Sequence, residues 1–556
     1  ETNLDILGDE VSLEKPTINV KKIHSDSYQQ VASSGGDRYP DVNDELENAI
    51  EVGALVINYF GHGGEDGLAS EYIFTKGTGQ DLKNKNRYPC IVTVTCEFTK
   101  FDNPQRVTAG ELTFWNKEGG AISLVTTTRS ISASVGVEFN QVLTPELFGY
   151  GLDIPNTPAE AVRISKNSIG SENRRVVFYI GDPSMHLAFP RQKIELTTIN
   201  GIPIAQSTEV LKALDKVKLG GEIQDINGNL ISNYKGVLEA KLFDKNLERS
   251  TLGNDGVSLN GQLLILDFIT LGEVLFNGKA TVIDGIFEFE FVMPRDTEIP
   301  VDTGRISFYS QEDNSLSNQT GYNIDLKIGG LNEDAPEDNQ GPVINLFMND
   351  ESFVSGGITN DSPILIAKLS DDNGINTASG IGHDMIAILD GDESNPFVIN
   401  EYYQANVDDY TNGKASFTFR DLEEGIHTLT FKAWDVYNNS STSEIQFIVA
   451  GNDELEITNV LNYPNPFVSY TEFWFNHNRP FEPLEVQIQV FTVTGKVVWT
   501  KNQIINTDGF LSREIVWDGK DDFGDRIGKG VYVYKITVIS LLTNKRVEKF
   551  EKLVIL

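Results

Sequence analysis

The chain has 556 residues, of which 39% are hydrophobic and 23% are charged, so it has the composition of a folded protein and is long enough for several domains. Its 81 acidic and 45 basic residues give a formal net charge of −36, which repels phosphate backbones and argues against nucleic acid as a partner. No apolar run approaches the roughly 18 residues of a membrane-spanning helix, and no signal peptide opens the chain. Because the first residue is Glu1, we expect the C-terminal part of a longer precursor.

Residues 1–190 alternate strand-like and helix-like segments, which predicts an α/β domain with a mostly parallel sheet. The expected strands are 18–23, 54–60, 91–97, 121–126 and 175–180, and the expected helices are 43–52, 109–117, 138–148 and 159–168. The second and third strands are nearly continuous apolar or β-branched runs, as in strands buried on both faces. We therefore expect the chemistry at the carboxyl edge of this sheet.

From residue 191 onward, short alternating strands separated by Gly, Asn and Asp turns predict an all-β region. We expect three immunoglobulin-like β-sandwich domains, at 191–331, 341–450 and 451–556, with an acidic linker at 332–339. The clearest strand patterns are 427–434, 486–490 and 530–536. The fold class is thus multidomain, an α/β domain followed by all-β domains.

The only two cysteines, Cys90 and Cys96, are six residues apart in one strand-like run. An extended chain separates them by roughly 20 Å, whereas a disulfide needs α-carbons within about 7 Å, so we expect two free thiols. A lone cysteine in a strand is usually inert packing, and this interpretation suits Cys90.

His62 and Cys96 are the candidate catalytic residues. His62 lies in a glycine cluster directly after one buried strand, and Cys96 ends the next, so adjacent parallel strands would bring an imidazole and a thiol to one edge of the sheet. That pair suits acyl transfer: Cys96 would attack a carbonyl, and His62 would act as general base or ion-pair partner and then protonate the leaving amine. The backbone N–H groups of Gly63 and Cys96 would bind the oxyanion.

Several motifs resemble those of the gingipain-type cysteine peptidases. They are NYFGHGG (58–64), TCEF (95–98), AGE (109–111), GGAI (119–122) and GDPS (181–184), and the resemblance covers about residues 17–190. It implies a caspase-like fold with His62 and Cys96 as the catalytic pair. The segment before Ile18 is too short for the opening strands of such a domain, so these strands and any carboxylate that orients the histidine would lie elsewhere. Glu65, Asp66 and Glu71 are interpreted as solvated loop charges.

Within this group the chain is most similar to the sortases of the type IX secretion system, through FDNP (101–104), TTR (127–129), GHD (382–384) and LDGD (389–392). The resemblance implies an enzyme at the outer-membrane surface that removes C-terminal sorting domains from exported cargo and can pass the new carboxyl end to a lipopolysaccharide amine. An acyl group on Cys96 would explain both outcomes, because water or an amine resolves a thioester.

The tail motifs NYPNPF (462–467) and GVYVY (530–534) resemble the type IX C-terminal sorting domain, which the outer-membrane barrel PorV recognises. Without the family they are an ordinary proline-rich strand entry and a tyrosine-rich strand. Two other functions stay open: a secreted gingipain-like protease that is itself cargo, and a surface adhesin with an inactive peptidase domain.

No cofactor is expected, although structural calcium is an alternative at three loops rich in hard oxygen ligands. These loops are 371–374, 390–393 and 518–522, and none has the spacing of an EF-hand. Asp and Gly fill plain turns as well, so each loop can equally be only a turn.

Overall fold

The computed structural model describes residues 1–190, 192–315, 317–379, 382–449, 455–480, 482–507 and 509–556. Two compact units emerge: Glu1–Glu337 with Thr377–Ser379 and Asn406–Tyr410, and Asp338–Asn376 with Gly380–Ala405 and Thr411–Leu556. The predicted boundaries at 191 and at 450–451 lie outside the described residues. None of the described helices is long and apolar enough to cross a membrane.

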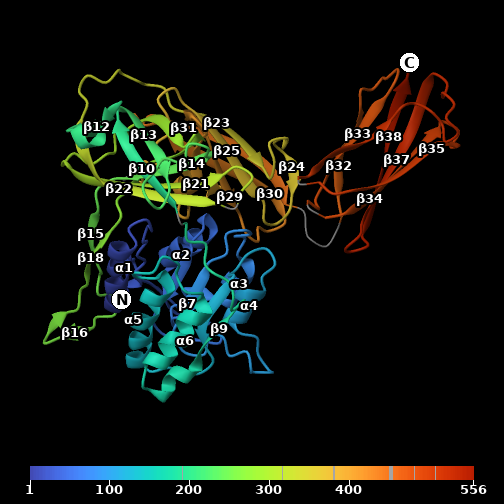
Figure 1. Cartoon of the computed structure of the whole chain (residues 1–556). Helices are drawn as coiled ribbons and strands as arrows, with labels where there is room; N and C mark the ends of the chain where they lie inside the picture. The colour runs from blue at the N-terminus through green and yellow to red at the C-terminus, as the bar shows by residue number, and fades with distance from the viewer. Residues whose placement is uncertain (191, 316, 380–381, 450–454, 481, 508) are drawn as a thin grey trace. The chain divides into compact units, whose positions relative to one another are not determined.

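A four-stranded sheet organises the first part of the chain (Figure 1). Its order is β3 (Val56–Tyr59), β7 (Cys90–Thr93), β8 (Ser123–Thr127) and β9 (Val177–Ile180), with β3, β7 and β8 parallel and β9 antiparallel to β8. All residues of β7 and β8 are buried, which explains the continuous apolar run of β7.

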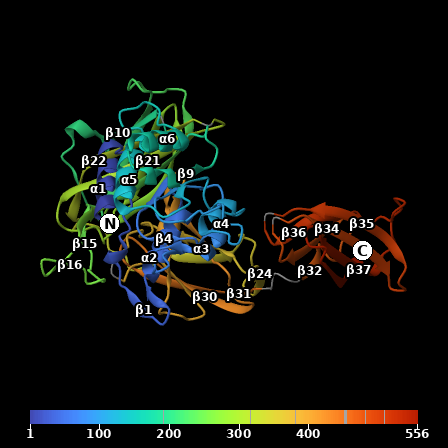
Figure 2. The same cartoon turned by 90° about the horizontal axis from the view of Figure 1, so that it is seen from below.

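Helices cover both faces of this sheet (Figures 1 and 2). Cys90 and Val92 on β7 pack with α5 (Ala133–Phe148) and α6 (Pro158–Ser168). On the other face, Ile57 of β3 packs with α2 (Pro40–Val52), and Ile91 of β7 packs with α4 (Ala109–Trp115). The remaining elements here are α1 (Thr2–Glu14), η1 (Ser25–Ser27), β1 (Val31–Ser33), β2 (Gly36–Arg38), β4 (Gly63–Gly64), β5 (Gly67–Leu68), β6 (Phe74–Thr75), α3 (Lys76–Asp81) and η2 (Glu172–Val176).

Four of the five predicted strands and all four predicted helices of this region are present, with ends shifted by a few residues. The strand predicted at 18–23 is wrong, and helix α1 was not predicted. Side-chain contacts hold this segment in place of a strand ladder: Lys22 Nζ lies 2.6 Å from Asp5 Oδ1 of α1, and the Arg305 guanidinium donates to Asn19 Oδ1 at 2.8 Å.

Residues 192–331 form one nine-stranded sheet in the order β11-β10-β13-β20-β19-β14-β21-β22-β12. An additional parallel pairing of β10 with β22 closes it on itself, unlike the two separate sheets of an immunoglobulin-like sandwich. Its strands are β10 (Gln192–Ile199), β11 (Ile202–Pro203), β12 (Val210–Ala213), β13 (Lys216–Gln224), β14 (Lys235–Phe243), β19 (Val274–Ile283), β20 (Ile286–Val292), β21 (Asp302–Glu312) and β22 (Asn318–Leu331). Beside it lie η3 (Ile204–Gln206) and two short ladders, β15 (Leu247–Ser250) with β18 (Asp267–Thr270) and β16 (Ser258–Leu259) with β17 (Gln262–Leu263).

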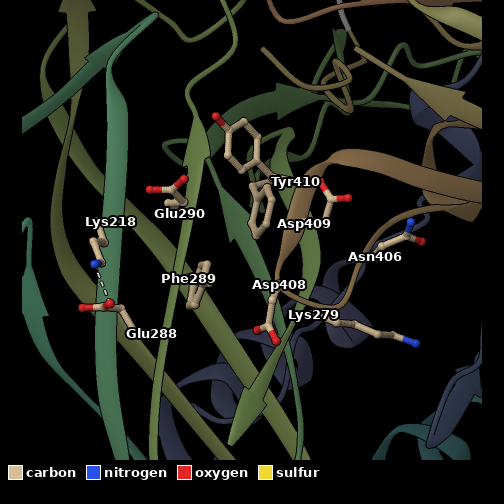
Figure 3. Close-up of a pocket in the computed structure, with 10 residues that line it drawn as sticks. Lys218, Lys279, Glu288, Phe289, Glu290, Asn406, Asp408, Asp409 and Tyr410 are labelled. Atoms are coloured by element: carbon tan, nitrogen blue, oxygen red, sulfur yellow. Dashed lines mark ion pairs between the residues drawn. The ribbon is translucent and has the colours of Figure 1, made fainter. Parts of the chain in front are cut away.

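A cavity of about 200 Å³ opens on this closed sheet (Figure 3). The stacked rings of Phe276 and Phe289 line it together with the ion pair of Lys218 and Glu288, whose charged atoms lie 2.5 Å apart. None of the predicted catalytic residues is among its lining residues.

Two pairs of sheets follow. The first pair is β23-β25-β29-β28 and β24-β31-β30-β26-β27, and the second is β32-β33-β36 and β35-β34-β37-β38. The three clearest predicted strand patterns lie within β30, β34 and β37. The bounds are β23 (Val343–Met348), β24 (Gly357–Thr359), β25 (Ile364–Ser370), β26 (Ile386–Leu389), β27 (Phe397–Val398), η4 (Asn400–Tyr402), β28 (Tyr403–Asn406), β29 (Asp409–Thr418), β30 (Gly425–Trp434), β31 (Ser440–Val449), β32 (Ile457–Tyr463), β33 (Thr471–His477), β34 (Leu484–Thr492), β35 (Val497–Ile505), β36 (Leu511–Trp517), β37 (Gly530–Ser540) and β38 (Arg546–Ile555).

Candidate active site

The register of β3 and β7 brings His62 and Cys96 to the same level of the sheet. The two strands pair in parallel, and Tyr59, the last residue of β3, lies opposite Thr93, the last residue of β7. His62 and Cys96 each follow three residues later, beyond the carboxyl ends of adjacent strands. The predicted meeting of the two chain segments at this edge is therefore present.

Thr95 joins these two segments directly. Its hydroxyl donates a hydrogen bond of 2.6 Å to the carbonyl oxygen of Gly61, the residue before His62. A Cβ atom on Gly63, the residue after His62, would lie only 2.6 Å from Cγ2 of Thr95. Glycine at 63 thus permits a close approach that any side chain would prevent.

The chain turns sharply at the candidate nucleophile. Glu97, directly after Cys96, has a φ of +56°, in the left-handed region that non-glycine residues rarely occupy. Cys96 itself is partly exposed, and its Sγ lies 3.9 Å from the carbonyl oxygen of Ile131. Cys90, by contrast, is fully buried, and burial raises the pKa of its thiol to about 11. The accessible thiol is therefore that of Cys96.

His62 is exposed, and its backbone carbonyl is held by two donors. The Tyr59 hydroxyl donates to it at 2.7 Å and the Ala69 N–H at 2.8 Å. In an antiparallel ladder, hydrogen-bonded and non-hydrogen-bonded residue pairs alternate. Because His62 and Ala69 form a hydrogen-bonded pair, the next pair, Gly63 and Leu68, is not hydrogen-bonded. The N–H of Gly63 therefore points away from β5. The assignment of the oxyanion donors to Gly63 and Cys96 stays a prediction.

Glu65 is not the solvated charge that the sequence indicated. Its side chain is only 13% exposed, and it accepts a hydrogen bond of 2.9 Å from the Asn103 amide and lies 3.2 Å from Lys100 Nζ. The hydrogen bond from Lys100 holds the pKa of this carboxyl below its usual range. Asp66, which is exposed, pairs with Lys76 and Arg106. These contacts tie the His62 segment to the Cys96 segment.

Within the described part of the chain, no side chain forms a hydrogen bond with the His62 ring. The site as described is thus a cysteine and a histidine without an orienting carboxylate. Sequence reasoning identified these two residues but missed Thr95 and Glu65. The only sequence signals for the latter two were their positions, directly before Cys96 and three residues after His62.

Two further motifs have a structural explanation. The Arg129 guanidinium makes a two-pronged contact with the Asp102 carboxylate at 2.9 and 2.6 Å, which joins the segments that follow β7 and β8 at the edge of the candidate site. Gly120 precedes β8 at the opposite edge of the sheet, where it has a φ of +90° and a Cβ would lie 1.9 Å from the carbonyl oxygen of Thr113. Arg129 and Asp102 therefore connect the loops beside the site, whereas Gly120 has a structural role away from it.

Of the three loops considered for calcium, one contributes to a carboxylate cluster among the described residues. Oxygen atoms of Asp338, Asp371 and Asp435 lie within 4.8 Å of one another. Asp390 instead accepts hydrogen bonds from His427 Nδ1 and from the Thr428 N–H. In the third loop, Asp518 pairs with Lys520 at 3.0 Å.

Comparison with known proteins assigns a family to the first part of the chain. Residues 1–188 match the model of peptidase family C25. Among solved structures, the dimeric latent PorU of Porphyromonas gingivalis is 26% identical, with a TM-score of 0.31 over 79% of this chain and 41% of that chain. The Arg-specific cysteine proteinase gingipain R is 14% identical, with a TM-score of 0.24 over 51% of this chain and 55% of that chain.

The chain spans less than half the length of the PorU chain, and no curated protein matches it. The assignment rests on the family match over residues 1–188. Residues 1–188 therefore match the peptidases of family C25, and the family assignment applies to this segment.

Proposed function

We propose that this protein is a cell-surface cysteine endopeptidase and sortase, which removes the C-terminal sorting domains of type IX secretion cargo. The observation that carries the proposal is the common register of His62 and Cys96 after two adjacent parallel strands, with Thr95 joining the two segments. The similarity of the motifs to those of type IX sortases supports the choice of substrate.

In the proposed reaction, His62 takes the proton of the Cys96 thiol, and the resulting thiolate attacks the scissile carbonyl carbon. The N–H groups of Gly63 and Cys96 stabilise the resulting oxyanion. When the C–N bond breaks, His62 gives its proton to the leaving amine, and a thioester on Cys96 remains. Water then releases a carboxylate, or a lipopolysaccharide amine forms an amide, and in both cases the thiol of Cys96 is restored.

The proposal includes a location at the outer-membrane surface and PorV as the partner of residues 451–556. Its support is the proline-rich motif at 462–467, which combines structural and accessible residues. Phe467 is 2% exposed and its N–H donates to the carbonyl oxygen of Val554, whereas Tyr463 is 61% exposed. The exposed part of the motif is the surface we assign to docking.

The test is processing of a purified type IX cargo protein by the full-length enzyme, followed by mass spectrometry. Wild type is compared with Cys96→Ala and with the matched variant Cys90→Ala, so that each variant keeps one thiol. We expect wild type and Cys90→Ala to release the cargo's sorting domain and Cys96→Ala to leave it attached, because only Cys96 offers an accessible thiol.

Equal cleavage by Cys96→Ala would remove the catalytic role of Cys96, and no cleavage by wild type would favour the adhesin alternative. The same mass spectra give the C terminus of the enzyme itself. A protein that still ends at Leu556 after secretion agrees with a sortase, whereas loss of its own C-terminal domain would identify it as processed cargo.

A further inference from the structure

The side chain of Thr95 lies against the backbone on both sides of the candidate histidine. We propose that it is a positioning residue, which sets His62 against Cys96. This inference rests on the proposed function, because it assumes that His62 and Cys96 form the catalytic pair. Thr95 is 1% exposed, so it acts through its neighbours and not on the substrate.

The hydroxyl of Thr95 fixes the entry to the histidine turn. It donates to the carbonyl oxygen of Gly61 at 2.6 Å, a short contact between segments 34 residues apart in the chain. Since Gly61 directly precedes His62, this bond determines how far the turn lies from the strand that carries Cys96. Gly61 is exposed, so without this donor its carbonyl would bond to water and the turn would no longer be held to Thr95.

The side chain of Thr95 also lies against the exit from the same turn, with its hydroxyl about as close as its methyl group. The position of a Cβ on Gly63 would be 2.6 Å from Cγ2 and 2.7 Å from Oγ1 of Thr95. The backbone of residue 63 therefore lies directly against this side chain. The two residues that flank His62 therefore both contact Thr95.

The neighbouring strand fixes Thr95 in turn. The Thr127 hydroxyl, on β8, donates to the carbonyl oxygen of Thr95, the residue directly before the nucleophile. The position of the Cys96 backbone is thus set by β8, and that of the His62 backbone is set by Thr95. Catalytic rates depend steeply on such placement, since about 1 Å of misplacement costs roughly 100-fold.

Two substitutions of Thr95 distinguish the effect of its hydroxyl group from that of its branched side-chain shape. Thr95→Val keeps the branched shape but puts a methyl group where the donor lies 2.6 Å from the Gly61 carbonyl oxygen. Thr95→Ser keeps the donor and loses only the methyl group. We expect the valine variant to lose roughly 10- to 100-fold in kcat on a cargo peptide with KM within about twofold, and the serine variant to stay within about threefold of wild type.

A second measurement needs no cargo. The rate of Cys96 alkylation by iodoacetamide is followed against pH, because thiol reactivity reflects the neighbouring imidazole. We expect the profile of Thr95→Val to approach that of His62→Ala, and the profile of Thr95→Ser to follow wild type. Thr93→Val is the matched control, since its hydroxyl bonds to Thr126 on β8 and not to the histidine turn.

Wild-type kcat and alkylation in Thr95→Val would overturn the positioning role. An equal loss of kcat in Thr93→Val, with the same fall in melting temperature, would show a general structural effect and would also overturn it. A kcat of Thr95→Ser as low as that of Thr95→Val would do the same. Failure of the proposed function looks different: Cys96→Ala would then cleave cargo as well as wild type, whatever the Thr95 variants do.

Discussion

At the scale of single residues, the folded state disfavours the ionised form of the Asp371 carboxyl group. Burial raises its pKa, as do the nearby charges of Asp435 and Asp338, while hydrogen bonds from backbone N–H groups such as that of Asn373 lower it. The net pKa is about 6. Asp435 is fully buried, and its pKa is raised as well, again mainly by burial. The cluster therefore holds more negative charge near neutral pH than its surroundings stabilise.

We predict that this part of the chain becomes less stable as pH rises from about 4 to about 7. The folded pKa of Asp371 lies above the ordinary value of 3.8, so the folded state binds the proton more tightly than the unfolded state. Its stabilising contribution is complete below about pH 4 and is lost as pH passes through about 6. Asp371→Asn should add about 1–2 kcal/mol at pH 8 and little at pH 4.

Hydrogen exchange of peptides from β30 and β31 would measure this, with each variant compared with wild type at the same pH. Asp372→Asn is the control, because the neighbouring Asp372 is exposed. A gain that is equal at both pH values would contradict the argument. The measurements are made in chelator, since calcium bound at the three carboxylates would offset the same repulsion, and calcium there stays a prediction.

Some residues of the candidate site could be predicted from the sequence, and others could not. His62 and Cys96 could be identified because each follows a strand-like run and one of them lies among glycines. Glu65 was misjudged, because its partners Lys100 and Asn103 belong to another segment, and nothing local distinguishes a paired loop carboxylate from a solvated one. Thr95 was missed for the same reason.

At the scale of elements, helix α4 begins directly after the loop that follows the nucleophile and is anchored by a reciprocal capping box. The Thr108 hydroxyl accepts from the Glu111 N–H at 3.4 Å, and the Glu111 carboxylate accepts from the Thr108 N–H at 2.9 Å. Both residues are buried. Helix α6 has a simpler cap, in which Thr157 accepts from the Glu160 N–H at 3.2 Å.

We predict that Thr108→Ala destabilises the peptidase domain by about 2 kcal/mol and Thr157→Ala by about 1 kcal/mol. The difference arises because Thr108→Ala also removes a hydroxyl donor, 2.7 Å away, from the buried Glu111 carboxylate. Cys90 is a convenient reporter, since it is fully buried and its thiol can be alkylated only when the domain opens. Urea-dependent labelling of Cys90 gives the two values, and equal shifts would contradict the capping-box argument.

Element types were predicted more successfully than their pairings. The apolar runs of β3 and β7 and the helical periodicity of α5 and α6 are local signals, so these elements were found. The closure of the nine-stranded sheet depends on β10 pairing with β22, which lie more than 100 residues apart. Such a pairing leaves no local pattern, and two open sheets were expected instead.

At the scale of the whole molecule, the acidity is unevenly distributed along the chain. Residues 451–556 contain 14 of the 81 acidic and 12 of the 45 basic residues, residues 1–190 contain 26 and 16, and residues 191–450 contain 41 and 17. The segment that we assign to docking is thus nearly balanced, the segment that carries the candidate active site is acidic, and most of the net charge of −36 lies between them. Anionic acceptors are therefore repelled from the catalytic part of the chain.

This distribution predicts how salt affects the proposed transfer to lipopolysaccharide, whose phosphates are anionic. Like-charged partners associate faster when salt screens their repulsion, and the Debye length falls from about 30 Å at 0.01 M to about 8 Å at 0.15 M ionic strength. Transfer of the acyl group to lipopolysaccharide should rise several-fold over that range. Transfer to glycinamide, which carries no negative charge, should change little, and so should hydrolysis by water. Mass spectrometry of the three products from one reaction gives their ratios, and a fall in the lipopolysaccharide product with added salt would mean that local basic contacts, not the net charge, govern the approach of the acceptor.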